Sequence, residues 1–125
     1  MELTSFIEKD KAEEVINAIN NGTDIMVTGG VGSGKTQLCK TLSKIAAGSE
    51  YEYNIVDEAY TESSINFIED VICRKNNKNE PCRIIFSYHT KDESVIRRTF
   101  PNFKGLVLNL EADCHIKVPY LTYID

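Results

Sequence analysis

The chain lacks the features of secreted, membrane-spanning and disulfide-bonded proteins. It does not open with a basic segment followed by an apolar stretch, and no apolar run approaches the length of a membrane-spanning helix. The four cysteines, at positions 39, 73, 82 and 114, include no C-x-x-C pair, so we expect reduced thiols. Together these absences predict a cytoplasmic protein without a membrane span.

Excess positive charge is absent as well. The 14 Lys and Arg residues are outnumbered by 19 Asp and Glu residues, which gives a formal net charge of −5. Surfaces that bind nucleic acid are usually basic, so this balance argues against nucleic acid as the main partner. The sequence also contains no internal repeat, low-complexity segment or linker. Its 125 residues, 42% of them hydrophobic, predict one domain that spans residues 1–125.

The most informative feature that is present is a glycine-rich loop at residues 29–36, which reads Gly-Gly-Val-Gly-Ser-Gly-Lys-Thr. Gly29, Gly34, Lys35 and Thr36 occupy the fixed positions of G-x-x-x-x-G-K-[ST], a motif that holds nucleotide phosphates. A short apolar run precedes the loop and a helix-forming stretch follows it. Strand, loop and helix in this order are the context that the motif requires.

Such a loop binds phosphate because glycines let successive backbone N–H groups point inward beside a helix N-terminus. We expect contacts to a nucleotide from Gly29, Gly30, Val31, Gly32, Ser33, Gly34, Lys35, Thr36 and Gln37. Lys35 would place its charge near the β- and γ-phosphates, and Thr36 would offer a hydroxyl to Mg²⁺. The alternative is a glycine turn that binds nothing, but a plain turn has no use for the Lys-Thr pair.

A second motif is the acidic pair Asp57 and Glu58, which follows the apolar residues 55–56. An acid at the carboxyl end of a strand beside the strand of the glycine-rich loop can hold Mg²⁺ through water. A second acid next to it can orient and deprotonate an attacking water. We therefore assign Asp57 to the metal, with Thr36, and Glu58 to the water. The alternative is a solvated pair that opens a loop.

A third motif, Ser-Tyr-His-Thr at residues 87–90, directly follows another strand. Ligands of open α/β sheets bind at the carboxyl ends of the strands, so we expect Ser87 and His89 on the same rim as Glu58. His89 could then hydrogen-bond a γ-phosphate and report its loss. Arg98, further along, could stabilise transition-state charge in its own subunit or a neighbouring one. An exposed basic helix face is the alternative for Arg98.

The hydrophobic pattern predicts strands that alternate with helices, hence a mostly parallel sheet of four to five strands in an α/β fold with three layers. The expected strands are residues 24–28, 51–56, 82–87 and 106–110, with an edge strand or extended cover within 116–124; the expected helices are 10–19, 36–45, 61–72 and 91–99. Asp10 is the expected N-cap of the first helix, in a capping box with Glu13. Residues 74–81 are expected to form a surface loop. We expect the Asp57 strand at one side of the sheet and the 106–110 strand beyond that of the glycine-rich loop.

These motifs give the chain a resemblance to the secretion and pilus traffic ATPases, the RecA-like motors of type II and type IV secretion systems. Residues 24–36 are similar to that family's strand and Walker A segment, and Glu58 stands at the acidic end of a Walker B motif. Residues 87–90, followed by Ile96 and Arg98, resemble the family's His box. The resemblance implies a minimal RecA-like P-loop NTPase with ATP and Mg²⁺ as cofactors. It is also compatible with a homo-oligomer or larger assembly.

The chain departs from that family in size and in two motifs. It has no room for the family's separate N-terminal domain, and only 20 residues lie between Thr36 and Asp57, where the family carries an acidic Asp box. Asp57 also stands where the family commonly has glycine. We therefore expect a Mg²⁺-dependent ATPase, while three alternatives remain open. These are a non-hydrolysing ATP-binding switch, a small-molecule phosphotransferase and a DNA-linked ATPase of a mobile element.

Overall fold

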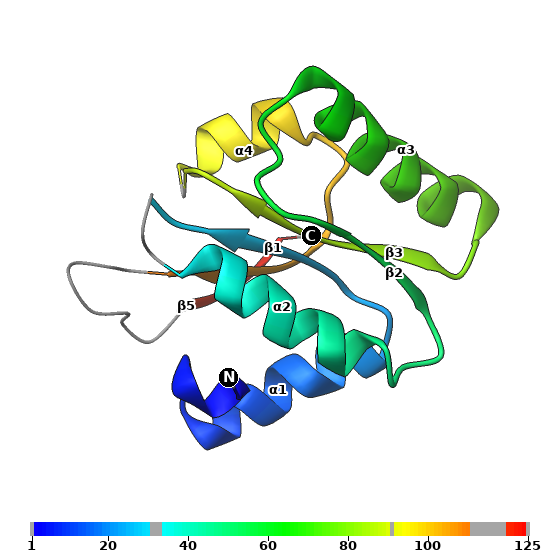
Figure 1. Cartoon of the computed structure of the whole chain (residues 1–125). Coiled ribbons are helices and arrows are strands. Elements are labelled where there is room, and N and C mark those ends of the chain that lie inside the picture. Colours follow the sequence, from blue (N-terminus) through cyan, green and yellow to red (C-terminus); the bar gives the residue numbers. More distant parts are fainter. Residues whose placement is uncertain (1, 31–33, 91, 111–119, 125) are drawn as a thin grey trace.

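The computed structural model describes residues 2–30, 34–90, 92–110 and 120–124 of the chain, and helices and strands alternate along it (Figure 1). In order, the elements are η1 (Leu3–Ser5), α1 (Lys9–Asn20), β1 (Asp24–Thr28), α2 (Lys35–Ala46), β2 (Glu52–Val56), α3 (Glu62–Lys78), β3 (Cys82–Tyr88), α4 (Glu93–Thr99), β4 (Gly105–Asn109) and β5 (Tyr120–Ile124).

The strands form one sheet in the order β2-β3-β1-β4-β5. The first four are parallel, and β5 runs antiparallel to β4 at the edge. The predicted α/β fold, its parallel sheet and the position of β4 beyond β1 are confirmed. Strand β2, which leads to Asp57, lies at one side of the sheet, as expected. It does not lie beside β1, as the interpretation of the acidic pair assumed, because β3 pairs with both β1 and β2. The β1 and β2 termini still meet on one rim, since parallel strands share their carboxyl end.

Helices cover both faces of the sheet, with α1 and α2 on one side and α3 and α4 on the other (Figure 1). Successive residues of a strand point to opposite faces, so both faces of the central strands can be apolar. In β1, Ile25 and Val27 pack with α1 and α2, while Met26 packs with α3 and α4. Phe86 of β3 lies in the second cluster, with its ring 4.8 Å from that of Phe100.

Two expectations about helix ends are wrong. Asp10 lies inside α1, which begins at Lys9, and the side chain of the N-cap residue Glu8 makes no capping hydrogen bond. Residues 74–78, expected in a surface loop, belong to the last part of α3, which ends only where Asn79 adopts a left-handed backbone with φ of 52°. Polar residues are tolerated there because residues 76–78 are exposed to solvent, while half-buried Lys75 bonds to Asp24 of the sheet.

The remaining boundaries agree with the sequence pattern to within a few residues. Thr61 caps α3 by accepting a hydrogen bond from the backbone N–H of Ser64. The tail forms an edge strand over residues 120–124, as expected, and residues 116–119 lie outside the described part of the chain. No helix within the described residues is long and apolar enough to cross a membrane.

A buried ion pair ties α3 to the amino end of the sheet. Asp24, fully buried at the start of β1, accepts a hydrogen bond from the Lys75 ammonium at 2.6 Å and another from the Ile84 backbone N–H at 3.0 Å. Burial raises the pKa of the Asp24 carboxyl, and Lys75 opposes that increase. The carboxylate therefore depends on Lys75 for its charge compensation.

Replacing Lys75 by Met should lower the free energy of unfolding by about 3 kcal/mol at pH 7, because a carboxylate would remain buried without its cation. A carboxyl with a raised folded-state pKa stabilises the fold most below its unfolded pKa, and this contribution is lost as the pH rises through the folded pKa. The difference in the free energy of unfolding between wild type and variant should therefore shrink as the pH falls from 7 towards 4. Urea unfolding across this pH range measures that difference. The double change Asp24→Asn with Lys75→Met is the control, and a single-variant deficit that is the same at both pH values would contradict the assignment.

Candidate functional site

Strand β1 leads into the glycine-rich loop at the carboxyl edge of the sheet. Gly34 precedes α2 with φ of 92°, a left-handed backbone that side chains rarely adopt, so a glycine is needed at this helix start. The first four N–H groups of a helix lack intrahelical partners and can donate hydrogen bonds to a bound anion. Val31, Gly32 and Ser33, which we expect to contact phosphate, lie outside the described residues.

Lys35, the first residue of α2, is almost fully buried, with 9% of its surface exposed. Its ammonium donates a hydrogen bond to the backbone carbonyl of Gly30 at 2.9 Å. No carboxylate among the described residues lies within ion-pair distance of it. An ammonium has three donors and a full charge, and a buried one is normally paired. A bound anion would supply that pairing.

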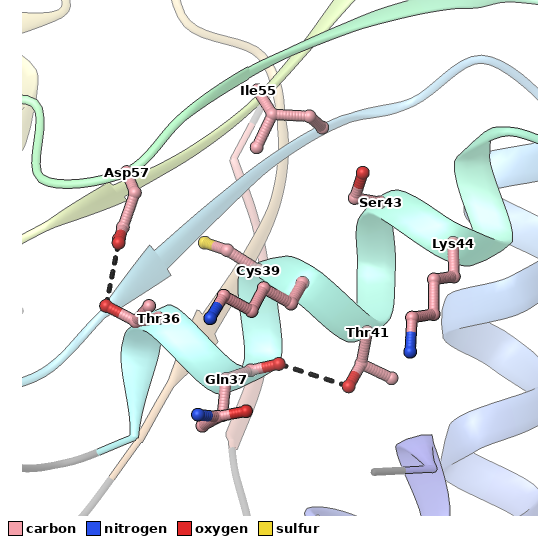
Figure 2. A pocket seen from close by; sticks show the side chains of 9 residues that line it. Thr36, Gln37, Cys39, Thr41, Ser43, Lys44, Ile55 and Asp57 are labelled. Atoms are coloured by element: carbon pink, nitrogen blue, oxygen red, sulfur yellow. Dashed lines mark hydrogen bonds between the residues drawn. The ribbon is translucent and has the colours of Figure 1, made fainter.

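Asp57, immediately after β2, bridges two other elements of the rim. Its Oδ2 accepts a hydrogen bond from the Thr36 hydroxyl of α2 at 2.7 Å, and its Oδ1 accepts one from the Ser87 hydroxyl of β3, also at 2.7 Å. Figure 2 shows Thr36 and Asp57 pointing toward one another. Both carboxylate oxygens are thus held, which fixes the orientation of Asp57 towards the start of α2.

Glu58 has an unusual backbone, with φ of 60°. Its N–H donates to the Ser87 hydroxyl at 2.6 Å, and the N–H of Ala59 donates to the Ser87 carbonyl at 2.8 Å. A left-handed backbone is strained for residues other than glycine and is often found at functional sites. Fully buried Ser87 therefore holds this strained turn, and it does so with the same hydroxyl that orients Asp57.

A pocket of about 330 Å³ lies on this rim and is lined by Lys35, Glu58, Ala59, Tyr60 and His89. Glu58, Tyr60 and His89 are exposed, so they border solvent, whereas Lys35 is buried. The His89 ring lies 4.5 Å from the ring of the preceding Tyr88, centroid to centroid. The structure thus brings together three of the residues that the sequence indicated, namely the lysine, the second acid and the histidine.

Cys39 lies buried beneath this rim. Burial, together with the negative charge of nearby Asp57, raises the pKa of the Cys39 thiol to about 12. The thiol therefore stays protonated near neutral pH and is a poor nucleophile.

Gln37 and Arg98 lie elsewhere. Gln37 is exposed on α2 and lines a different hollow, beside Thr36 and Asp57. Arg98 is exposed in the last turn of α4 and is not among the described residues that line the pocket of Lys35 and His89. Hydrogen bonds from Ser94 and, more weakly, the charge of Arg98 lower the pKa of Asp92, which caps this helix.

The oxygen donors at the site fit Mg²⁺. The described residues contain no group of three or more His, Cys, Asp or Glu side chains that could hold a metal ion. Mg²⁺ needs no such group, because it is typically held by one or two protein oxygens together with waters and substrate phosphates. The Thr36 hydroxyl and the Asp57 carboxylate, hydrogen-bonded to one another, are oxygen donors of the required kind.

Comparison of the chain with models of known protein families, with curated protein sequences and with solved structures gave no match in any of the three.

The sequence-based expectations did not include Tyr60, and they placed Ser87 on the rim without its hydrogen bonds. Tyr60 lines the pocket, and Ser87 carries the hydrogen bonds that hold the acidic pair. Tyr60 could have been found, because it lies two residues beyond Glu58 on the same rim. The hydrogen bonds of Ser87 could not have been predicted, because they depend on β3 lying next to β2 in the sheet.

Proposed function

We propose that this chain is an ATP-binding P-loop protein that hydrolyses ATP with Mg²⁺, as a minimal RecA-like relative of the secretion and pilus traffic ATPases. The observation that carries the proposal is the buried Lys35 ammonium, without a carboxylate partner among the described residues, in one pocket with Glu58 and His89. The glycine-rich motif supplies the phosphate chemistry and the resemblance supplies the choice of ATP.

In this proposal Lys35 and the backbone N–H groups of residues 30–36 hold the phosphates. Thr36 and Asp57 hold Mg²⁺, which when bound neutralises phosphate charge and favours departure of ADP. The strand order supports this division of roles, because β3 separates β1 from β2 and its Ser87 hydroxyl orients Asp57. Ser87 is thus a positioning residue.

Glu58 is the proposed general base. It takes a proton from a water whose oxygen attacks the γ-phosphorus, the bond from that phosphorus to the β–γ bridging oxygen breaks, and ADP and inorganic phosphate leave. His89, which lines the same pocket as Lys35, donates a hydrogen bond to the γ-phosphate and senses its loss. Arg98 remains a candidate for charge stabilisation from a neighbouring subunit, since it lies outside the described pocket lining.

Calorimetry of ATP binding, run beside a phosphate-release assay on the purified wild type, tests the proposal. The expected result is ATP binding together with turnover that requires Mg²⁺. Binding without turnover would instead support a non-hydrolysing switch. Turnover that depends on added nucleoside monophosphate would indicate a phosphotransferase, and turnover that depends on single-stranded DNA would indicate a DNA-linked ATPase. Absence of nucleotide binding would overturn the proposal.

A further inference from the structure

A trough runs along the outer edge of β2, on the face of the sheet that α2 covers. It consists of two hollows, of about 410 and 180 Å³, that share Ser43 and Ile55 as lining residues. The larger hollow reaches the bonded pair Thr36 and Asp57, and the smaller one reaches Tyr51, just before β2 begins. Figure 2 shows the larger hollow between α2 and Ile55. The trough thus follows the whole length of the strand.

The backbone of β2 is open along this edge. Within the described part of the chain, β2 pairs with β3 alone. The N–H of Glu52 donates toward the β3 side, to Pro81, so by alternation Tyr53 and Ile55 turn their N–H and C=O groups outward. Edge strands are usually protected by charged residues, proline or a covering element. Apart from Glu52 at its start, β2 contains no charged residue and no proline.

The side chains of the trough combine an apolar floor with positive charge. Ile55 is 39% exposed there, one of the few large apolar side chains exposed among the described residues. Lys40 and Lys44 of α2, four residues apart on one face of the helix, also line it and are exposed. No carboxylate among the described residues forms an ion pair with either lysine. Two unpaired cations thus flank an apolar surface on a chain whose net charge is −5.

We infer that this trough binds an extended peptide segment of another protein, which adds to β2 as a further strand. The partner's backbone would pair with Tyr53 and Ile55, one apolar side chain would cover Ile55, and acidic side chains would lie near Lys40 and Lys44. An extended chain fits because five strand residues span about 17 Å and need a long, narrow site, whereas a compact small molecule would occupy only one hollow. The inference goes beyond nucleotide binding and does not depend on it.

Selection of random octapeptides displayed on phage, with the full chain immobilised in the absence of nucleotide, tests this inference. The recovered peptides should share an apolar residue flanked by Asp or Glu. Their affinity, measured by calorimetry with synthetic copies, should fall at least tenfold for Ile55→Asp and for the double change Lys40→Glu with Lys44→Glu. The double change Lys9→Glu with Lys11→Glu on α1, with the same charge difference at exposed positions, should leave it unchanged.

A second measurement separates strand addition from simple charge attraction. Methylation of alternate backbone nitrogens in the best peptide should abolish binding in one register and leave it intact in the other, because only one set of N–H groups faces β2. The inference would be overturned if the Lys40→Glu and Lys44→Glu change abolished binding while neither methylated peptide lost it. Recovery of no peptides, or equal binding by the Ile55→Asp variant, would also overturn it. So would a wild-type dimer that Ile55→Asp dissociates, since the trough would then bind a second copy of the chain.

Discussion

The Lys35→Ala variant is expected to lose ATP binding while it remains folded. In the structure the Lys35 ammonium has one hydrogen bond, to the Gly30 carbonyl, and no carboxylate partner among the described residues. Charge-assisted hydrogen bonds contribute about 1.5–3 kcal/mol each, so loss of two phosphate contacts would weaken binding by at least about 100-fold. The free energy of unfolding should change by less than about 1 kcal/mol, because loss of one hydrogen bond is offset by removal of a buried charge.

Calorimetry with ATP, beside thermal unfolding of the same sample, measures both parts of this prediction. Lys44→Ala is the matched control, because it removes an exposed lysine from the same helix at a distance from the pocket of Lys35. Unchanged ATP affinity in a folded Lys35→Ala protein would contradict the central proposal. If the Lys35→Ala protein fails to fold, Lys35→Met is measured in its place. This variant keeps the buried aliphatic volume and is expected to lose ATP binding to the same extent.

The Glu58→Gln variant is expected to bind ATP with nearly wild-type affinity and to hydrolyse it about 10²- to 10⁴-fold more slowly. The change removes the proton acceptor but keeps the size of the side chain. The strained backbone at Glu58 is held by the N–H bond to Ser87, which a side-chain amide does not disturb. The turn that carries the residue should therefore persist in the variant.

Single-turnover phosphate release, with binding measured in parallel, checks this expectation. Glu62→Gln, which alters an exposed acid in the first turn of α3, is the control and should leave the rate unchanged. A Glu58→Gln protein with wild-type turnover would show that Glu58 is not the base. Because the variant tests hydrolysis alone, that result would leave the phosphate-binding role of Lys35 in place.

The sequence allowed the order and type of the main elements to be predicted, because their signals are local. Alternation of apolar runs with helical patterns indicated the parallel sheet, and Thr28 and Ser87 fall near strand ends as expected. Local signals failed where solvent and packing decide the outcome. Asp10 does not cap α1, which begins one residue earlier. Helix α3 runs through residues 74–78, where Lys75 reaches the buried Asp24 and Asn79 ends the helix.

For the candidate site, the sequence by itself determined which chemical groups are available: the glycine-rich loop, Lys35, the acidic pair and His89. Only the tertiary structure decided how they are held. The insertion of β3 between β1 and β2 brings the Ser87 hydroxyl to Asp57 and to the backbone of Glu58. Among the described residues, it also leaves the outer edge of β2 without a strand partner beside α2. The physical reason is that strand order depends on packing between segments far apart in the chain, which no local pattern specifies.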